Sequence, residues 1–135
     1  MKTKEYTLRT DREGMYNITA SLCEAIRESG VQSGIAVICC LHTTAGITIN
    51  ENADPDVQHD LLLGLAAAFP DRPQFRHAEG NSTAHLKCSY VGASQTVLIE
   101  GGKPLLGTWQ GVYFCEFDGP RTRRYLIKVL EDSDQ

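Results

Sequence analysis

The sequence contains no apolar run that approaches the roughly 20 residues of a membrane-spanning helix. Its first ten residues, MKTKEYTLRT, lack the apolar centre of a secretory signal and instead alternate like a strand. Cysteine occurs five times, an odd number, and Cys39 and Cys40 are adjacent, which argues against a complete disulfide framework. We therefore expect a cytoplasmic protein with reduced thiols and no membrane partner.

Basic residues are too few for a general nucleic-acid binder. The 13 Lys and Arg residues are outnumbered by 17 Asp and Glu residues, which gives a formal net charge of -4. A protein that binds nucleic acid or an anionic membrane needs a basic face that displaces counterions. The nearest cluster is Arg121, Arg123 and Arg124, which suits a single anion better than a duplex. We expect no nucleic-acid partner.

Common cofactor motifs are missing as well. The sequence has no Gly-x-x-x-x-Gly-Lys loop, no Gly-x-Gly-x-x-Gly and no Cys-x-x-Cys. We therefore expect no nucleotide or flavin cofactor, and structural zinc of the usual kind has no support. Internal repeats, low-complexity segments and long linkers are also missing, so residues 1–135 are expected to form a single domain.

Hydrophobic periodicity divides the chain into short elements. Helical spacing predicts helices over residues 18–29, 55–69 and 83–90. Alternation predicts strands near residues 3–10, 33–42 and 46–51. The last third reads as three more strands joined by Gly-Gly and Asp-Gly-Pro turns. Because hairpins imply antiparallel pairing and the helices are few, we predict an α+β domain built on an antiparallel sheet.

Local signals place the ends of these elements. Asn17 is the expected N-cap of the first helix and Gly30 its stop, while Asp54 caps the second helix with Pro55 at its first position. The strand SGIAVICCLH, residues 33–42, is apolar on both faces. We therefore expect it to be central and covered on both sides.

Three histidines lie where functional sites tend to be built. His42 ends a strand, His77 opens the loop HAEGNSTAHLK, and His85 lies in the helix that follows; His59 is mid-helix and is read as exposed. Three imidazoles with an open fourth position form a catalytic type of zinc site. Their spacing matches no compact ligand signature, so each could equally be an ordinary surface or hydrogen-bonded histidine.

The segment NENADPD, residues 50–56, has more polar groups than a strand-to-helix connection needs. Helix capping accounts for Asp54. On the preceding strand, Asn50 faces away from Ile47 and Ile49, because side chains alternate. If those isoleucines face a core, Asn50 meets water or a ligand. If the sheet is covered on both sides, Asn50 needs buried partners.

The stretch LGTWQGVYFCEFDGPR holds the only tryptophan, Trp109. A tryptophan in a strand is usually core, but neighbouring glycines and Gln110 leave a ligand platform as the second interpretation. Glu116 alternates onto the same face as apolar residues, where a carboxylate is costly unless paired. An arginine after the following turn is the natural partner. Cys40 and His42 share a strand face, but a small buried cysteine is the default over a nucleophile.

Three blocks together resemble one known family. The segments HTTAGITINENADPDV (42–57), HAEGNSTAHLK (77–87) and LGTWQGVYFCEFDGPRTRR (106–124) are similar to the secondary thiamine-phosphate synthase family, also called YjbQ-like. The resemblance implies antiparallel sheets packed as a sandwich with two or three short helices, assembled as a homotrimer. It also implies a secondary activity that joins a hydroxymethylpyrimidine diphosphate to a thiazole phosphate with loss of pyrophosphate.

The resemblance carries motif positions onto this sequence: His42, Asn50, Glu51, Asp60, His77, Gly80, Asn81, His85, Trp109, Gln110 and Glu116. We assign catalytic roles to His42, Asn50, His85, Gln110 and Glu116. Substrate contacts are assigned to Trp109, Asn81, Arg121 and Arg123. The ligands of a Zn²⁺ or other divalent ion would be His42, His77 and His85. The substrate is expected to be small and phosphorylated. The rival hypothesis is a trimeric protein that binds a metabolite or metal without turnover.

Overall fold

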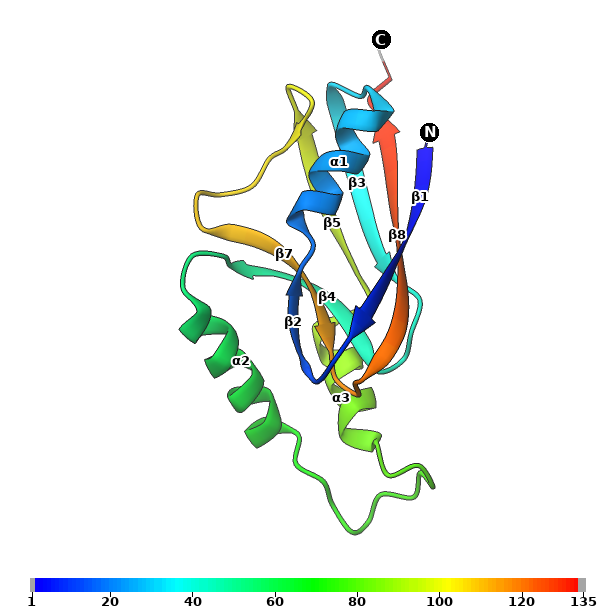
Figure 1. The fold of residues 1–135 in the computed structure, drawn as a ribbon, viewed down its shortest axis with the longest axis vertical. Coiled ribbons are helices and arrows are strands. Elements are labelled where there is room, and N and C mark those ends of the chain that lie inside the picture. The colour runs from blue at the N-terminus through cyan, green and yellow to red at the C-terminus, as the bar shows by residue number, and fades with distance from the viewer. Residues whose placement is uncertain (1, 134–135) are drawn as a thin grey trace.

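Two antiparallel sheets form the body of the protein in a computed structural model that describes residues 2–133 (Figure 1). The larger sheet has the strand order β1-β8-β3-β5-β6. Its strands are β1 (Lys2–Thr10), β8 (Arg121–Glu131), β3 (Ser33–Cys40), β5 (Ser94–Glu100) and β6 (Lys103–Pro104). The smaller sheet has the order β2-β7-β4. Its strands are β2 (Gly14–Asn17), β7 (Gln110–Glu116) and β4 (Ala45–Glu51).

Three helices accompany the sheets: α1 (Thr19–Ser29), α2 (Pro55–Ala68) and α3 (Ser82–Val91). The prediction of an α+β fold with antiparallel sheets and few helices is confirmed. Two of the predicted helix boundaries are confirmed, and Gly30 ends α1 with a φ of 74°. The N-cap of α1 is Ile18 and not the predicted Asn17, which lies one residue earlier and accepts a hydrogen bond from the backbone N–H of Thr19 at 3.0 Å. Asp54 accepts from the N–H of Asp56 at 2.9 Å at the start of α2.

The main core lies between the inner faces of the two sheets and the buried stripe of α1. Leu22 and Ile26 of α1 pack with Ile38 of β3, Ile127 of β8 and Phe114 of β7, and each of these side chains is fully buried. Apolar surface removed from water is the main favourable contribution to folding, about 25 cal/mol for each Å². The helical spacing seen in the sequence therefore identifies the face of α1 that packs against both sheets.

The smaller sheet is covered on both faces. Its second face carries Tyr113 and Cys115 of β7, which pack with Phe117 just after that strand and with Ala84 of α3 in a separate apolar cluster. Close approach is needed here, because a Cβ at Gly46 of β4 would lie 2.7 Å from a backbone oxygen near the end of α3. A strand with both faces buried can present polar side chains to solvent only at its ends, so β7 has two ends at which a site can form.

The outer face of the larger sheet carries an apolar stripe that is only partly buried. Along β3, side chains alternate between buried and partly exposed positions, and Ile35 and Val37 lie on the exposed face. Leu98 of β5, opposite Ile35 in the register, is 57% exposed, and Leu130 of β8 flanks Ile35 on the other side. The prediction that strand 33–42 is covered on both sides is therefore wrong within this chain, because no other described element packs on that face.

Helix α2 stands away from the body along most of its length (Figure 1). None of its residues is buried, although it is rich in leucine and alanine, and Leu63 is 63% exposed. A small cavity of about 100 Å³ separates Leu61 and Leu65 of α2 from Thr48 of β4. No helix within residues 2–133 is both long and apolar enough to cross a membrane.

Candidate functional site

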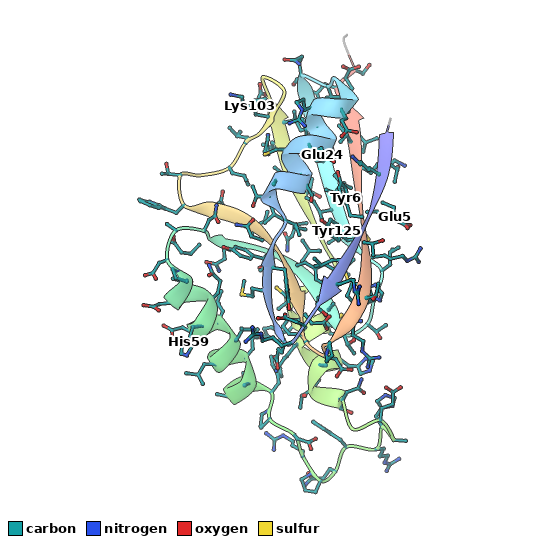
Figure 2. The ribbon with its side chains drawn as sticks, viewed as in Figure 1. Glu5, Tyr6, Glu24, His59, Lys103 and Tyr125 are labelled. Atoms are coloured by element: carbon teal, nitrogen blue, oxygen red, sulfur yellow. The ribbon has the colours of Figure 1, made fainter. Side chains whose placement is uncertain are left out.

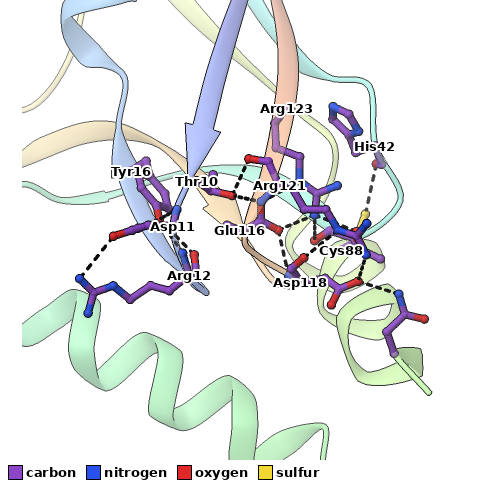
Figure 3. A network of polar contacts seen from close by, with 12 residues as sticks. Thr10, Asp11, Arg12, Tyr16, His42, Cys88, Glu116, Asp118, Arg121 and Arg123 are labelled. Atoms are coloured by element: carbon purple, nitrogen blue, oxygen red, sulfur yellow. Dashed lines mark hydrogen bonds and ion pairs between the residues drawn. The ribbon is translucent and has the colours of Figure 1, made fainter. Parts of the chain in front are cut away.

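A cluster of polar side chains gathers at the carboxyl end of β7 (Figure 3). Four segments meet there: the end of β1, the loop between β3 and β4, the start of α3 and the turn between β7 and β8. We refer to this group, Thr10, His42, Thr44, Asn81, Glu116, Asp118, Arg121 and Arg123, as the polar cluster. It joins parts of the chain that are more than 100 residues apart, such as Thr10 and Arg121.

Glu116 is the centre of the polar cluster and is fully buried. Arg123 donates to it through Nε at 2.7 Å and through a second, shorter contact from Nη2. Thr10 donates its hydroxyl to Glu116 at 2.7 Å, and Arg123 reaches the hydroxyl of Thr44 at 2.9 Å. Burial alone would raise the pKa of Glu116, but the bonds from Arg123, the Asp118 backbone N–H and Thr10 outweigh it and lower the pKa. The predicted pairing of Glu116 with an arginine is confirmed.

Asp118 connects this buried pair to the start of α3. Its carboxylate accepts from the amide of Asn81 at 2.7 Å and from Arg121 at 2.9 Å. Burial acts to raise the pKa of Asp118, and these two donors lower it overall. The other amide atom, Oδ1 of Asn81, is buried and has no hydrogen-bond partner in the described part of the chain. Buried carbonyl oxygens are nearly always satisfied, so this atom indicates a missing donor.

His42 lies beside Arg123, in the loop that leads from β3 to β4 (Figure 3). Its Nε2 accepts a hydrogen bond from the backbone N–H of Arg124 at 2.8 Å, and its backbone oxygen is 3.8 Å from the thiol of Cys88 on α3. Burial, followed by the charge of Arg123, lowers the pKa of His42. The imidazole is therefore neutral, and its lone pair at Nε2 is occupied.

His77 and His85 form a second histidine group. Their rings meet edge to face with centroids 5.2 Å apart. The loop between them turns at Gly80, which has a φ of 75° and donates to the backbone oxygen of His77 at 3.0 Å. A left-handed φ strongly favours glycine, so this turn positions Asn81 at the start of α3.

The three predicted metal ligands do not form a centre as they lie. Among residues 2–133, no group of three or more His, Cys, Asp or Glu side chains is arranged to hold a metal ion. His42 in particular offers no free lone pair at Nε2, because Arg124 uses it. His77 and His85 could supply two nitrogens, whereas protein zinc sites commonly use three or four protein ligands. The polar cluster does not fit a resident zinc ion within this chain.

The remaining predicted residues lie at the other end of β7. Gln110 begins that strand and Glu116 ends it, six residues away, a separation of about 20 Å in an extended strand. Asn50 of β4 pairs in register with Gly111 and is exposed. Trp109 is 64% exposed, so it is not a core residue. We call Asn50, Trp109 and Gln110 the tryptophan edge.

The three arginines are all engaged within the chain. Arg123 binds Glu116, Arg121 binds Asp118, and Arg124 contacts Glu5 at 3.2 Å. Their use as unpaired cations for a diphosphate is therefore not supported. Cys40 is buried, and burial raises the pKa of its thiol to about 11, which favours the small-core interpretation over a nucleophile. His59 is exposed on α2 as expected (Figure 2).

Several members of the site were not found from the sequence. Thr10 and the Asp118 backbone N–H donate two of the four hydrogen bonds to Glu116, and Thr44 accepts one from Arg123. Lys87 of α3 is a buried cation that pairs with Glu13 at 2.8 Å. Asp118 could have been identified from the sequence, because it lies three residues before Arg121 across a turn, a spacing that allows an ion pair. The two threonines could not, since they join the cluster only through tertiary contacts.

Comparison with known proteins identifies the family. The family model described as UPF0047 protein YjbQ-like matches residues 4–132. The chain belongs to the YjbQ/UPF0047 family. It is 55% identical over 129 residues to the UPF0047 protein MJ1081 of Methanocaldococcus jannaschii, covering 95% of this chain and 94% of the relative. It is also 55% identical over 122 residues to the UPF0047 protein YugU of Bacillus subtilis, covering 90% and 92% of the two chains.

Solved YjbQ-like structures share the fold. An uncharacterised YjbQ/UPF0047 protein from Clostridium acetobutylicum superimposes with a TM-score of 0.92 at 53% identity, covering 94% of this chain and 99% of that one. A protein of unknown function from Sulfolobus solfataricus has a TM-score of 0.92 at 27% identity and 97% coverage of both chains. The two-sheet architecture is therefore that of the family, and these relatives carry no assigned function.

Proposed function

We propose that this protein is a small enzyme that acts on a phosphorylated metabolite at the polar cluster, with thiamine-phosphate synthase as a secondary activity. The observation that carries the proposal is the unpaired Oδ1 of Asn81, buried beside the Asp118–Arg121 pair. Buried ion pairs contribute little net stability, because desolvation cancels much of their attraction. This network requires desolvation of charged groups and leaves one acceptor, Oδ1 of Asn81, without a donor. Ligand binding explains such an arrangement better than a contribution to folding stability does.

The start of α3 is the part of the site best suited to a phosphate. No side chain caps its first turn, and that turn contains no acidic residue. Free backbone N–H groups at a helix N-terminus bind anions, and the helix dipole adds to the attraction. His85 lies in the same helix, one turn from its start, and the paired His77 closes the loop above it. These groups could hold the leaving diphosphate, a role that the three paired arginines cannot take.

The two halves of the predicted site would meet between protomers of a homotrimer. Within one chain the polar cluster and the tryptophan edge lie at opposite ends of β7. The tryptophan edge is exposed, and the outer face of the larger sheet carries an exposed apolar stripe at Ile35, Leu98 and Leu130. Large exposed apolar patches mark interfaces. An oligomer that covers this stripe could bring Trp109 of one protomer to His85 of the next.

Activity is tested with the aminopyrimidine diphosphate and the thiazole phosphate as substrates. His85→Ala should lower thiamine-phosphate formation about a hundredfold, because it removes a group positioned at the reacting phosphate. His59→Ala, an exposed histidine on α2, is the matched control and should keep full activity. Full activity in folded His85→Ala protein would end the proposal. Tight binding of both precursors by calorimetry without product would favour the non-catalytic binding protein instead.

Subunit mixing tests whether the site is shared. His85→Ala and Gln110→Ala proteins, each inactive, are unfolded together and refolded as mixed oligomers. If each site takes residue 85 from one protomer and residue 110 from its neighbour, about a quarter of the sites recover both groups. If both groups belong to one protomer, no activity returns. Recovery is therefore the expected result, and its absence assigns the site to single chains.

A resident divalent metal stays a prediction. Of the three predicted ligands, His77 and His85 lie side by side, and no group of three metal-binding side chains forms among residues 2–133, so a complete centre would need a ligand from elsewhere. Elemental analysis of the purified protein checks this. Bound metal that is lost in His85→Ala and kept in His59→Ala would support the prediction, and metal-free protein with full activity would contradict it.

A further inference from the structure

A large cavity lies far from the polar cluster. It is a groove of about 510 Å³ between the carboxyl end of α1 and the hairpin that joins β5 to β6. The groove flanks the start of β3, where Ser33 pairs with Glu100, whereas the polar cluster adjoins the end of that strand. Its volume falls in the range of about 300–1,000 Å³ that is usual for small-molecule sites. We call it the α1 groove.

Apolar side chains line the interior of the α1 groove. Val31, just after α1, is 6% exposed, Pro104 of β6 is partly exposed in the opposite wall, and Ile26 of α1 lies fully buried behind the surface. The hairpin wall is fixed by a hydrogen bond from the Gly102 N–H to the backbone oxygen of Gln32 at 3.0 Å. An apolar body entering this space would therefore meet a wall that is already formed.

Two cations line the same groove, although the charge of Arg27 also acts on Glu24 of the same helix. Arg27, in the last turn of α1, and Lys103, on the hairpin (Figure 2), both line the α1 groove. Neither side chain has a hydrogen bond or ion pair within residues 2–133. No acidic residue lines the groove. The dipole of α1 also stabilises a cation at its carboxyl end, which by itself could account for Arg27. The helix dipole does not account for Lys103, which lies on the β5–β6 hairpin.

We propose that the α1 groove binds a small organic acid, with its apolar body against Val31 and Pro104 and its carboxylate between Arg27 and Lys103. An apolar interior with a few converging polar groups is the usual composition of a ligand site. The two positive charges select a negatively charged head group, since a neutral one would leave both cations uncompensated. This site is separate from the polar cluster and does not depend on the function proposed for it.

Octanoate, below its micelle concentration, is the probe, and 1-octanol and acetate are its controls. Octanol has the apolar body without the charge, and acetate has the charge without the body. Octanoate should bind saturably in calorimetry, at least about tenfold more tightly than either control. The double variant Arg27→Gln/Lys103→Gln should lose at least about tenfold in affinity. Arg72→Gln, which removes an exposed arginine outside the groove, should bind octanoate like the unaltered protein.

Cys23 reports binding at the groove itself. Its thiol is exposed and lines the α1 groove, so bound octanoate should slow its alkylation by iodoacetamide, measured by peptide mass spectrometry. N-acetylcysteine in the same solution controls for the reagent. Equal affinity for octanol, unchanged affinity in the double variant, or unprotected Cys23 at saturating octanoate would each overturn the proposal. A double variant with an unchanged unfolding midpoint rules out misfolding as the cause of any loss.

Discussion

The carboxylate of Glu116 and the guanidinium of Arg123 meet in a two-point contact that water does not reach. The first residue ends β7 and the second lies early in β8, so the pair closes the turn between them. It also fixes the end of β1, through Thr10, and the loop that carries His42, through Thr44. Loss of either partner would therefore disturb three segments.

Arg123→Met should destabilise the protein by about 3–5 kcal/mol, because it leaves the Glu116 carboxylate buried without its partner. The measurement is urea unfolding at a fixed protomer concentration. Glu5→Gln removes an exposed ion pair with Arg124 and should cost less than about 1 kcal/mol. Equal effects of the two changes would mean that Glu116 is accessible to water.

Acid should destabilise the protein through the same carboxylate. The pKa of Glu116 in the folded protein is below its ordinary value of 4.5. A lowered folded-state pKa gives stability that is complete above about 4.5 and is lost as pH falls through the folded value. The Glu116→Gln protein should therefore lose less stability than the unaltered protein between about pH 5 and about pH 3. Parallel unfolding midpoints across that range would contradict this assignment.

The exposed stripe on the larger sheet should control assembly. Leu98→Asp places a charge in a position that is 57% exposed in a single chain, so the protomer should fold but lose the proposed trimer. Leu98→Met keeps the apolar contact and should assemble normally. Sedimentation equilibrium measures the mass of each species. A trimeric Leu98→Asp protein would show that another surface holds the protomers together.

The capping bond of α2 should be needed for its local order. Asp54→Ala removes the acceptor for the Asp56 N–H and should cost about 1 kcal/mol of helix stability. Because no residue of α2 is buried, this loss should appear as about fivefold faster amide exchange in the helix, with little change in global unfolding. Asp60→Ala, exposed on the same helix, is the control. Unchanged exchange in Asp54→Ala would mean that other contacts hold α2.

Much of the fold could be predicted because its signals are local. Gly30 and Asp54 mark helix ends through a φ angle and a side chain, and alternation marks the strands on either side. One wrong prediction was that both faces of one strand are covered. Residues 33–42 are apolar on both faces, yet no element within residues 2–133 covers the outer face, and local sequence does not show what packs on a strand.

The site was predicted in part for the same reason. Glu116 was recognised as needing an arginine, because an inward carboxylate among apolar residues has few alternatives. The sequence could not show that Gln110 and Glu116 point to different clusters, although they share one face of β7, because both ends of a strand have the same local pattern. It could not show that the lone pair of His42 is occupied, because the donor is a backbone N–H 82 residues away.

The position of β8 between β1 and β3 has a consequence for how the protein is made. Residues 2–10 leave the ribosome before residues 121–131, the strand with which they pair. Strand β1 therefore has no sheet neighbour until β8 has been made. Charged residues such as Lys4, Glu5 and Arg9 along it would limit premature association with other nascent chains during that delay. The larger sheet can accordingly be completed only after β8 has emerged.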